Sequence, residues 1–412
     1  MSSRSGWGAA QLGYCGNVHP APDLAALRAS IQEQFQGVRR QRGLAVQDSG
    51  LWISARAAAE LQQPEAREAF LDLLHECGLR LTSLNGFPYG QFHEGVVKAE
   101  VYRPTWAEPP RLEYSLQLAH LLAAALPLDC HQGVISSVPL GYAASWDPAQ
   151  QQQAEEQLRQ LTAALASLHR QSGKRILVCL EMEPDCVLEN TEQAIAFFKH
   201  WRSVDPHHRY LALCFDVCHQ AVMFEDCYRS LERLLAARVP VGKIQLSNAL
   251  VCQLPFADRR RREQVLQALG NFVEATYLHQ VKARDASGQL LAWADLPAAL
   301  KATAPALGQC PELRIHFHVP LFSEQFLLAE LHGCQQALLR TFDFLAEHPH
   351  FQPVLEVETY SWNVLPDILR PDGQQALLRG IAAELQWVEG QLRQRQLLRA
   401  QSSPLERSAH AY

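Results

Sequence analysis

The sequence predicts an α/β fold: an eight-stranded (β/α)8 barrel with inserted loops and a β-hairpin after its seventh strand. Short apolar runs alternate with longer amphipathic stretches along the chain, a pattern typical of a parallel sheet covered by helices. Four of the apolar runs end in a carboxylate or an imidazole, at 176–181, 210–216, 313–318 and 353–358. Because the carboxyl ends of barrel strands meet at one mouth, we expect these side chains to converge there.

Nine segments have the length and apolar character of strands, one more than an eight-stranded barrel can hold. They are 12–18, 51–54, 80–86, 133–140, 175–181, 210–216, 242–247, 313–319 and 353–359. The first two and 313–319 are the candidates for a strand outside the barrel. Two apolar runs within 277–294, separated by Ala-Ser-Gly-Gln, predict the inserted hairpin.

Amphipathic stretches between these segments predict the helices. They lie at 23–39, 57–78, 111–126, 148–171, 191–203, 225–237, 258–273, 322–347 and 372–398. Asp147 followed by Pro148 predicts a helix start, and Gly173 predicts the end of the same helix. The residues Asn190 to Gln193 resemble a capping box that opens the next helix.

Length and composition indicate one globular domain over residues 1–400, followed by a disordered tail over 401–412. The 412 residues are 48% hydrophobic with a net charge of −6, so no overall positive charge favours nucleic acid or an anionic membrane. Eleven cysteines without C-x-x-C pairing indicate a reducing compartment, and we expect a cytoplasmic protein without a secretory signal. The longest apolar run is well short of the ~20 residues of a membrane span.

Carboxylates and imidazoles at the predicted mouth indicate a divalent-metal site. Glu181 directly follows five apolar residues, which favours the mouth over an exposed pair with Glu183. Asp216 and His219 follow the next strand, although alone they would also suit a helix N-cap and a buried histidine. Oxygen and imidazole ligands suit Mn, Mg, Zn or Fe in an open catalytic site.

The two later strands repeat this pattern. His316 and His318 share one strand face, which is uncommon for core residues, and we expect a contact with metal or substrate. Glu356 and Glu358 alternate in the same way. Glu358 is nearer the predicted mouth and is therefore the expected ligand.

The long segment 85–106 is aromatic and punctuated by glycine. After a barrel strand, such a segment predicts a lid over a bound substrate. The alternative is an Ω-loop packed on the barrel. The candidate substrate contacts in it are His93, Lys98 and Trp106, with Phe87 and Tyr89 beside them.

Four motifs resemble the xylose isomerase-like TIM-barrel superfamily, which includes sugar isomerases, ketose 3-epimerases and an apurinic endonuclease. They are Leu180-Glu181, Asn190-Thr191, Phe215-Asp216 with His219, and Leu355-Glu-Val-Glu358. The resemblance implies that Glu181, Asp216 and Glu358 bind a divalent metal. It also implies that His219 contacts substrate, or metal as in the nuclease. In a metal-dependent enzyme acting on a carbonyl–hydroxyl pair, Glu181 or Glu358 would move a proton.

Gln245 departs from the superfamily pattern. It lies in the apparent seventh strand, where the relatives have a metal-binding histidine. Either the glutamine oxygen is a ligand, or His279, His316 or His318 supplies the imidazole. Strand alternation places Gln245 on the inward face, where it would contact the substrate or metal.

Further motifs over nearly the whole chain resemble the EboE family of metabolite traffic proteins. They lie at 12–20, 85–93, 101–106, 277–281, 316–320 and 358–362. The resemblance implies a role in exporting a biosynthetic precursor, together with partner proteins of an export system. It does not imply a reaction.

Three functions are consistent with these residues. The first is a metal-dependent isomerase or epimerase acting on a small sugar- or polyol-like metabolite. The second is a metal-dependent phosphoesterase with two or three metals, for which the extra histidines would provide ligands. The third is a non-catalytic metabolite-binding protein, and Gln245 is the best argument for it.

Overall fold

The computed structural model describes residues 6–399, apart from 91, 94, 256, 286 and 303–309. The tail expected to be disordered, 401–412, lies outside the described residues. None of the described helices is long and apolar enough to cross a membrane.

Eight parallel strands form the predicted barrel. In chain order they are β1 (Gly13–Tyr14), β2 (Gln47–Trp52), β3 (Leu79–Asn85), β4 (Gln132–Ser137), β5 (Arg175–Glu181), β6 (Leu211–Asp216), β7 (Val241–Leu246) and β14 (Val354–Val357). Their order in the sheet is β1-β14-β7-β6-β5-β4-β3-β2. A parallel bridge between Cys15, which follows β1, and Gly50 of β2 brings the two edge strands together and nearly closes the barrel.

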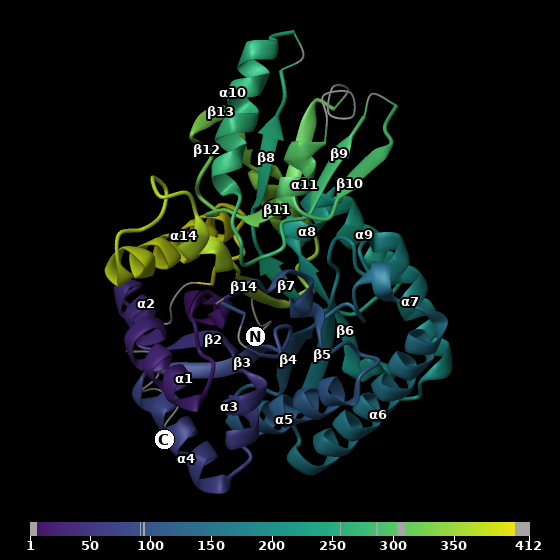
Figure 1. The fold of residues 1–412 in the computed structure, drawn as a ribbon. Coiled ribbons are helices and arrows are strands. Elements are labelled where there is room, and N and C mark those ends of the chain that lie inside the picture. The colour runs from purple at the N-terminus through teal and green to yellow at the C-terminus, as the bar shows by residue number, and fades with distance from the viewer. Residues whose placement is uncertain are drawn as a thin grey trace.

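Helices surround this barrel (Figure 1). They are α1 (Leu24–Ser30), α2 (Gln36–Gln41), α3 (Ala55–Glu60), α4 (Pro64–Glu76), α5 (Pro109–Ala125), α6 (Pro148–Ser172), α7 (Thr191–Val204), α8 (Val217–Val222), α9 (Cys227–Ala236), α13 (Gln335–Glu347) and α14 (Gln374–Gln394). The predicted caps of α6 are confirmed: Asp147 accepts from the backbone of Gln150, and Gly173 ends α6 in the left-handed conformation. Asn190 caps α7 by accepting from the backbone of Gln193, but the Gln193 side chain accepts from Glu189 instead of completing a capping box.

A second sheet is inserted between β7 and α13. Its strands are β8 (Ala249–Gln253), β9 (Val281–Arg284), β10 (Leu290–Trp293), β11 (Glu312–His318), β12 (Gln325–Phe326) and β13 (Leu328–Gly333), with helices α10 (Arg259–Leu269) and α11 (Leu296–Lys301). All its pairings are antiparallel, in the order β10-β9-β11-β8-β13-β12. Figure 1 shows this sheet, in green, standing over one end of the barrel.

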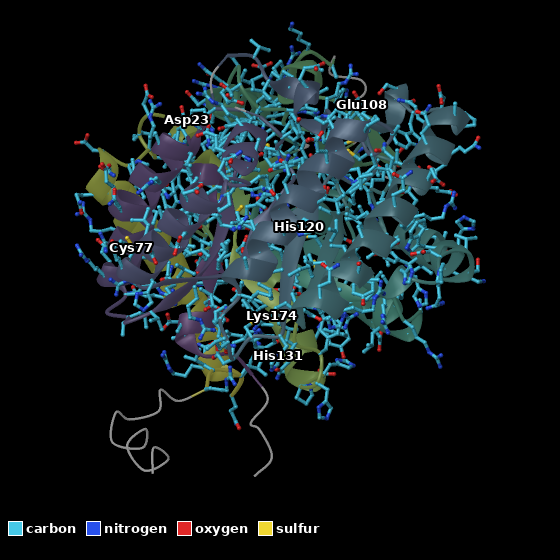
Figure 2. The ribbon with its side chains drawn as sticks, turned by 90° about the horizontal axis from the view of Figure 1, so that it is seen from below. Asp23, Cys77, Glu108, His120, His131 and Lys174 are labelled. Carbon is cyan, nitrogen blue, oxygen red and sulfur yellow. The ribbon has the colours of Figure 1, made fainter. Side chains whose placement is uncertain are left out.

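The opposite end of the barrel holds the strand starts. Figure 2, seen from below relative to Figure 1, labels His131 and Lys174, which directly precede β4 and β5; they lie close together in the lower part of the view, away from Glu108, which precedes α5, in the upper part. The carboxyl ends of the barrel strands face the inserted sheet, and side chains from both sheets meet there: His219 Nε2, just after β6, lies 3.0 Å from His316 Nε2 of β11.

Most of the sequence predictions of strands and helices are confirmed, and three of them need comment. The ninth candidate strand, 313–319, is β11 of the inserted sheet, whereas the first two candidates belong to the barrel. The predicted hairpin exists as β9 and β10, but it is part of a larger sheet. The helix predicted from 322 is wrong as far as 334, because this segment pairs with β8 instead, for example Leu331 with Cys252.

Candidate metal and catalytic site

A small cavity of about 80 Å³ lies at the carboxyl end of the barrel. One side of it is polar and is lined by Glu181, Glu183, His219, His316, His318 and Glu358. The other side is mostly apolar and comes from the 85–106 segment and from residues that follow α10. The barrel and the inserted sheet therefore share the walls of one site.

Three carboxylates meet beneath this cavity, as the strand ends predict. Glu181 ends β5, Asp216 ends β6, and Glu358 follows β14. One oxygen of each lies within 4.8 Å of the others, and all three side chains are buried. Among the described residues, no ion pair joins a lysine or arginine to any of them. The cluster therefore concentrates negative charge without a matching side-chain cation.

Hydrogen bonds position these carboxylates and leave lone pairs free. Asp216 Oδ1 accepts from Ser247 Oγ at 2.7 Å and from the backbone of His219 at 3.0 Å. Asn17 Nδ2 donates to Glu358 Oε1 at 2.6 Å. In contrast, Glu181 Oε2 and Asp216 Oδ2 are buried without a hydrogen-bond partner. Buried polar atoms normally find partners, so these oxygens are available to a ligand such as a cation.

Three imidazoles present lone pairs toward the same place. His219 Nδ1 is 2.7 Å from the carbonyl of Met182, and His318 Nδ1 is 2.9 Å from the carbonyl of Glu358. A carbonyl can only accept, so both Nδ1 atoms carry the proton and both Nε2 atoms present a lone pair. His318 Nε2 is buried and has no hydrogen-bond partner.

His316 has the same tautomer. Its Nδ1 lies 2.7 Å from Gln280 Oε1, and the amide nitrogen of Gln280 donates to the carbonyl of Pro184. His316 Nε2 consequently faces His219 Nε2 at 3.0 Å with a lone pair on each atom. Two such lone pairs repel unless a proton or a metal ion lies between them.

The electrostatics of the cluster suit a cation. Burial, and then repulsion from Glu358 and Asp216, raises the pKa of Glu181 well above its ordinary value. Burial likewise raises the pKa of Glu358. Burial would also raise the pKa of Asp216, but His219, His318 and the Ser247 hydroxyl lower it instead. Burial lowers the pKa of His318 to about 4, so the ring is neutral near pH 7, as a metal ligand must be.

Four overlapping groups place ligand atoms within 4.8 Å of one another. They are Glu181–Asp216–Glu358, Asp216–His219–His318, Glu183–His219–His316 and Cys218–His316–His318. The donor set of carboxylates and neutral imidazoles fits a divalent cation such as Mn, Mg, Zn or Fe. The first two groups share Asp216 and together hold all three unpartnered atoms.

Glu183 is a site residue that the sequence reasoning considered but did not select. It lines the cavity, accepts from the Tyr102 hydroxyl at 2.5 Å, and lies 3.7 Å from His316 Nδ1. Burial raises the pKa of its carboxyl above the ordinary value. Its i, i+2 spacing from Glu181 was the available signal, because alternate residues point to the same face of an extended strand.

Gln245 points inward, as alternation predicts, but it lies beneath the cavity. Its amide nitrogen donates to Glu358 Oε2, and its oxygen accepts from Cys214 Sγ at 2.7 Å. The glutamine therefore positions Glu358 in this arrangement and does not line the cavity.

Three predicted substrate contacts lie away from the cavity lining. His279 has both ring nitrogens engaged, with the carbonyl of His316 at 2.8 Å and with Glu274 Oε1 at 2.9 Å. His93 packs on Trp52, and its Nε2 is 2.6 Å from the carbonyl of Asn17. Trp106 is fully buried and packs in the hydrophobic core, so it does not reach the cavity. All three are supporting residues in this arrangement.

The 85–106 segment is fastened over the cavity. The backbone N–H groups of Val97 and Lys98 both donate to the carbonyl of Thr276. The Lys98 ammonium lies 2.8 Å from Asp295 Oδ2 and donates to the carbonyl of Tyr277 at 2.6 Å. Of the expected aromatic lid, Phe87 lines the cavity, whereas Tyr89 does not. The segment thus covers the cavity and also packs on the protein.

Comparison with known proteins gives fold-level likeness. No family model and no curated protein matches the chain, so the resemblance to the EboE family has no support there. Solved structures similar to this chain include an apo 3-keto-D-glucoside 4-epimerase from E. coli, with 11% identity, a TM-score of 0.43 and coverage of 92% of this chain and 99% of that one.

Two more solved structures are similar to the same extent. A D-tagatose 3-epimerase-like protein has 9% identity and a TM-score of 0.48, covering 93% of this chain and 98% of its own. The IOLI protein with a bound zinc atom has 10% identity and a TM-score of 0.45, covering 93% and 97%. The assignment of the barrel itself rests on the strand order described above.

Proposed function

We propose that this protein is a divalent-metal-dependent isomerase or epimerase acting on a small hydroxylated metabolite. The observation that carries the proposal is a set of three buried atoms without a hydrogen-bond partner, Glu181 Oε2, Asp216 Oδ2 and His318 Nε2. Glu181 and His318 line the cavity, and Asp216 forms ligand groups with both. Sugar epimerases among the similar structures agree with this activity.

The cation would be held by Glu181, Asp216, Glu358 and His318. When bound, it would polarise a substrate carbonyl and make the neighbouring C–H proton more acidic. His318 is held in its ligating tautomer by the Glu358 carbonyl, and Ser247 orients Asp216.

The chain's own residues would move the proton. Glu181 or Glu358 would remove it from the carbon next to the carbonyl, since both line the cavity and are buried. Return of the proton to the neighbouring carbon gives isomerisation, and return to the other face of the same carbon gives epimerisation. Glu183 and Tyr102 form a hydrogen-bonded pair at the cavity that can exchange a proton with a substrate hydroxyl.

A metal-dependent phosphoesterase is the second candidate. The observation in its favour is the further ligand group Glu183–His219–His316, which would suit a second cation. A non-catalytic binding protein would retain the cavity without proton transfer. A cytoplasmic location, and a role in exporting a precursor with partner proteins, follow only from composition and from the resemblance to the EboE family.

Solvent-isotope exchange tests the proton transfer. Metal-loaded protein is incubated in D2O with a panel of small ketoses and α-hydroxyketones, and C–H to C–D exchange is followed by NMR. We expect metal-dependent exchange that falls ~10²- to 10⁴-fold in Glu358→Gln, the range for loss of a general base. If the metal-loaded wild type shows no exchange but hydrolyses bis-p-nitrophenyl phosphate, the phosphoesterase is favoured. Absence of both reactions would favour the binding protein.

A further inference from the structure

The cationic side chains near the cavity already form ion pairs and hydrogen bonds within the protein. Among the described residues that line it, Lys98 alone has a cationic side chain. Its ammonium contacts Asp295 Oδ2 at 2.8 Å, the Tyr277 carbonyl at 2.6 Å and the Glu274 carbonyl at 3.2 Å. An ammonium has three protons, so all three are used. Lys98 therefore has no free donor for an anionic ligand.

The nearest buried cation below the cavity is occupied as well. Lys243 is fully buried, and its Nζ is 2.5 Å from Glu356 Oε1. It does not line the cavity. The side chains that do face the ligand space include Glu181, Glu183 and Glu358. A phosphate or sulfate group would meet carboxylates there and no unpaired lysine or arginine of the described lining.

Much of the remaining lining of the cavity is hydrocarbon and aromatic, and we call this part the apolar wall. It is formed by Phe87, Phe92, Val97, Val101, Tyr277 and Leu278. The nearby backbone N–H groups of Val97 and Lys98 donate to Thr276, and the Tyr102 hydroxyl donates to Glu183. A hydroxyl group against the phenyl and aliphatic side chains of this wall would lose its hydrogen bonds to water at a cost of ~1–3 kcal/mol. Elsewhere the lining offers a hydroxyl an acceptor in Asn17 Oδ1, which is buried without a hydrogen-bond partner.

The size of the cavity limits the ligand further. At about 80 Å³ it is smaller than the ~300 Å³ or more of most ligand pockets. A ligand bound in this arrangement is therefore small, and a polymer cannot enter without displacement of the 85–106 segment.

We infer that the substrate is a small uncharged molecule with two unlike ends: adjacent oxygens at the carboxylate and imidazole side, and a hydrocarbon part against the apolar wall. A phosphorylated sugar is disfavoured, because the described lining has no unpaired cation for the phosphate. The inference rests on the proposed function for the oxygen-bearing end. The apolar end rests only on the cavity lining.

Three probes separate these features. The first, 2-hydroxycyclohexanone, has adjacent oxygens and a hydrocarbon ring. The second, dihydroxyacetone, has the oxygens without the ring, and the third is dihydroxyacetone phosphate. Isothermal titration calorimetry on the full chain with Mn²⁺ gives the affinity order. We expect 2-hydroxycyclohexanone to bind at least ~10-fold more tightly than dihydroxyacetone, since burial of each CH2 contributes ~0.8 kcal/mol. We expect dihydroxyacetone phosphate to bind most weakly.

A variant pair assigns the preference to the wall. Leu278→Gln adds a polar group to the half-buried apolar wall and should remove most of the advantage of the ring. Leu128→Gln is the matched control, because Leu128 is 93% exposed and does not line the cavity. It should leave the affinity order unchanged.

Two outcomes overturn the inference. The first is tighter binding of dihydroxyacetone phosphate than of dihydroxyacetone. The second is an affinity for 2-hydroxycyclohexanone that is no higher than that for dihydroxyacetone, or too low to measure. A separate titration of Co²⁺-loaded protein, followed by visible absorption, reports whether the oxygens reach a bound metal. If the spectrum does not respond while the affinity order holds, the metal role in the proposed function fails and the inference about the apolar end stands.

Discussion

The barrel interior contains two layers of buried charge, built by the same two strands in different ways. In the lower layer, Lys243 of β7 pairs with Glu356 of β14, with Nζ and Oε1 2.5 Å apart. In the upper layer, two residues further along, Gln245 and Glu358 take the equivalent places, and Glu358 faces Glu181 and Asp216. The lower layer contains its own cation, and within the described residues the upper layer has no lysine or arginine partner.

The difference separates a structural role from a functional one. Burial would lower the pKa of Lys243, but the adjacent Glu356 carboxylate raises it, so the lower pair stays charged and compensated. Glu356 is also closely packed, because a Cβ added at Gly50 would lie 1.9 Å from its Oε2. In the upper layer, burial raises the pKa of Glu181, whereas that of Asp216 is lowered by His219, His318 and Ser247 against the effect of burial. Glu181 Oε2 and Asp216 Oδ2 have no hydrogen-bond partner. Buried charge that the chain leaves uncompensated indicates an external cation.

Removing the lysine would make the lower layer resemble the upper one. Lys243→Met leaves Glu356 buried without its partner, and we expect the free energy of unfolding to fall by ~3–5 kcal/mol. Urea unfolding measures the loss. The double variant Lys243→Met with Glu356→Leu should recover most of it, because no uncompensated charge remains. Arg259→Met, at an exposed ion pair, is the control and should leave the midpoint unchanged. A single variant as stable as wild type would contradict the account of the lower layer.

A third buried carboxylate, Glu384, extends the comparison. Within the described part of the chain it forms no ion pair, and it accepts from Thr359, Leu321 and Trp362. Burial raises its pKa to about 7 in spite of these donors. The folded state thus keeps a proton that the unfolded state releases near pH 4.5. Its contribution to stability is complete below about pH 4.5 and is lost as the pH rises through 7, a change of about 3 kcal/mol.

Unfolding measured from pH 4.5 to 8 tests this contribution. We expect the free energy of unfolding of wild type to fall relative to that of Glu384→Gln as the pH rises. A pH-independent difference between the two proteins does not affect this comparison. Glu263→Gln, an exposed glutamate, serves as the control for pH effects elsewhere. Parallel pH dependence of wild type and Glu384→Gln would show that Glu384 is ionised in the folded protein throughout this range.

The barrel strands were predictable because each is marked by a short run of residues next to one another in the sequence. Apolar runs that end in Glu181 and Asp216 place those residues at strand ends whatever the remote pairings are. The segment 322–334 was predicted incorrectly because Leu327 to Leu331 is rich in helix formers, whereas its strand structure depends on pairing with β8, about eighty residues earlier. Non-local pairing of this kind is not visible in one sequence.

The site was predictable by residue type but not by geometry. Alternation placed Gln245 on the inner face and grouped His316 with His318, and the structure brings His318 into a group with Asp216. Sequence cannot show which ring nitrogen is already bonded, and this separates His318, with a free Nε2, from His279, whose two nitrogens are engaged. Trp106 illustrates the same limit, since an aromatic residue in a loop can face the core or the cavity equally well.

Metal stoichiometry tests the central claim that the upper layer holds a divalent cation. Wild type and Asp216→Ala are reconstituted with Mn²⁺ or Zn²⁺, dialysed and measured by elemental analysis, with calorimetric titration for affinity. We expect at least one cation per chain in wild type and affinity at least ~100-fold weaker in Asp216→Ala, with unchanged circular dichroism of the metal-free variant. A wild type that retains no cation after reconstitution, or an Asp216→Ala variant that binds it equally well, would contradict the account.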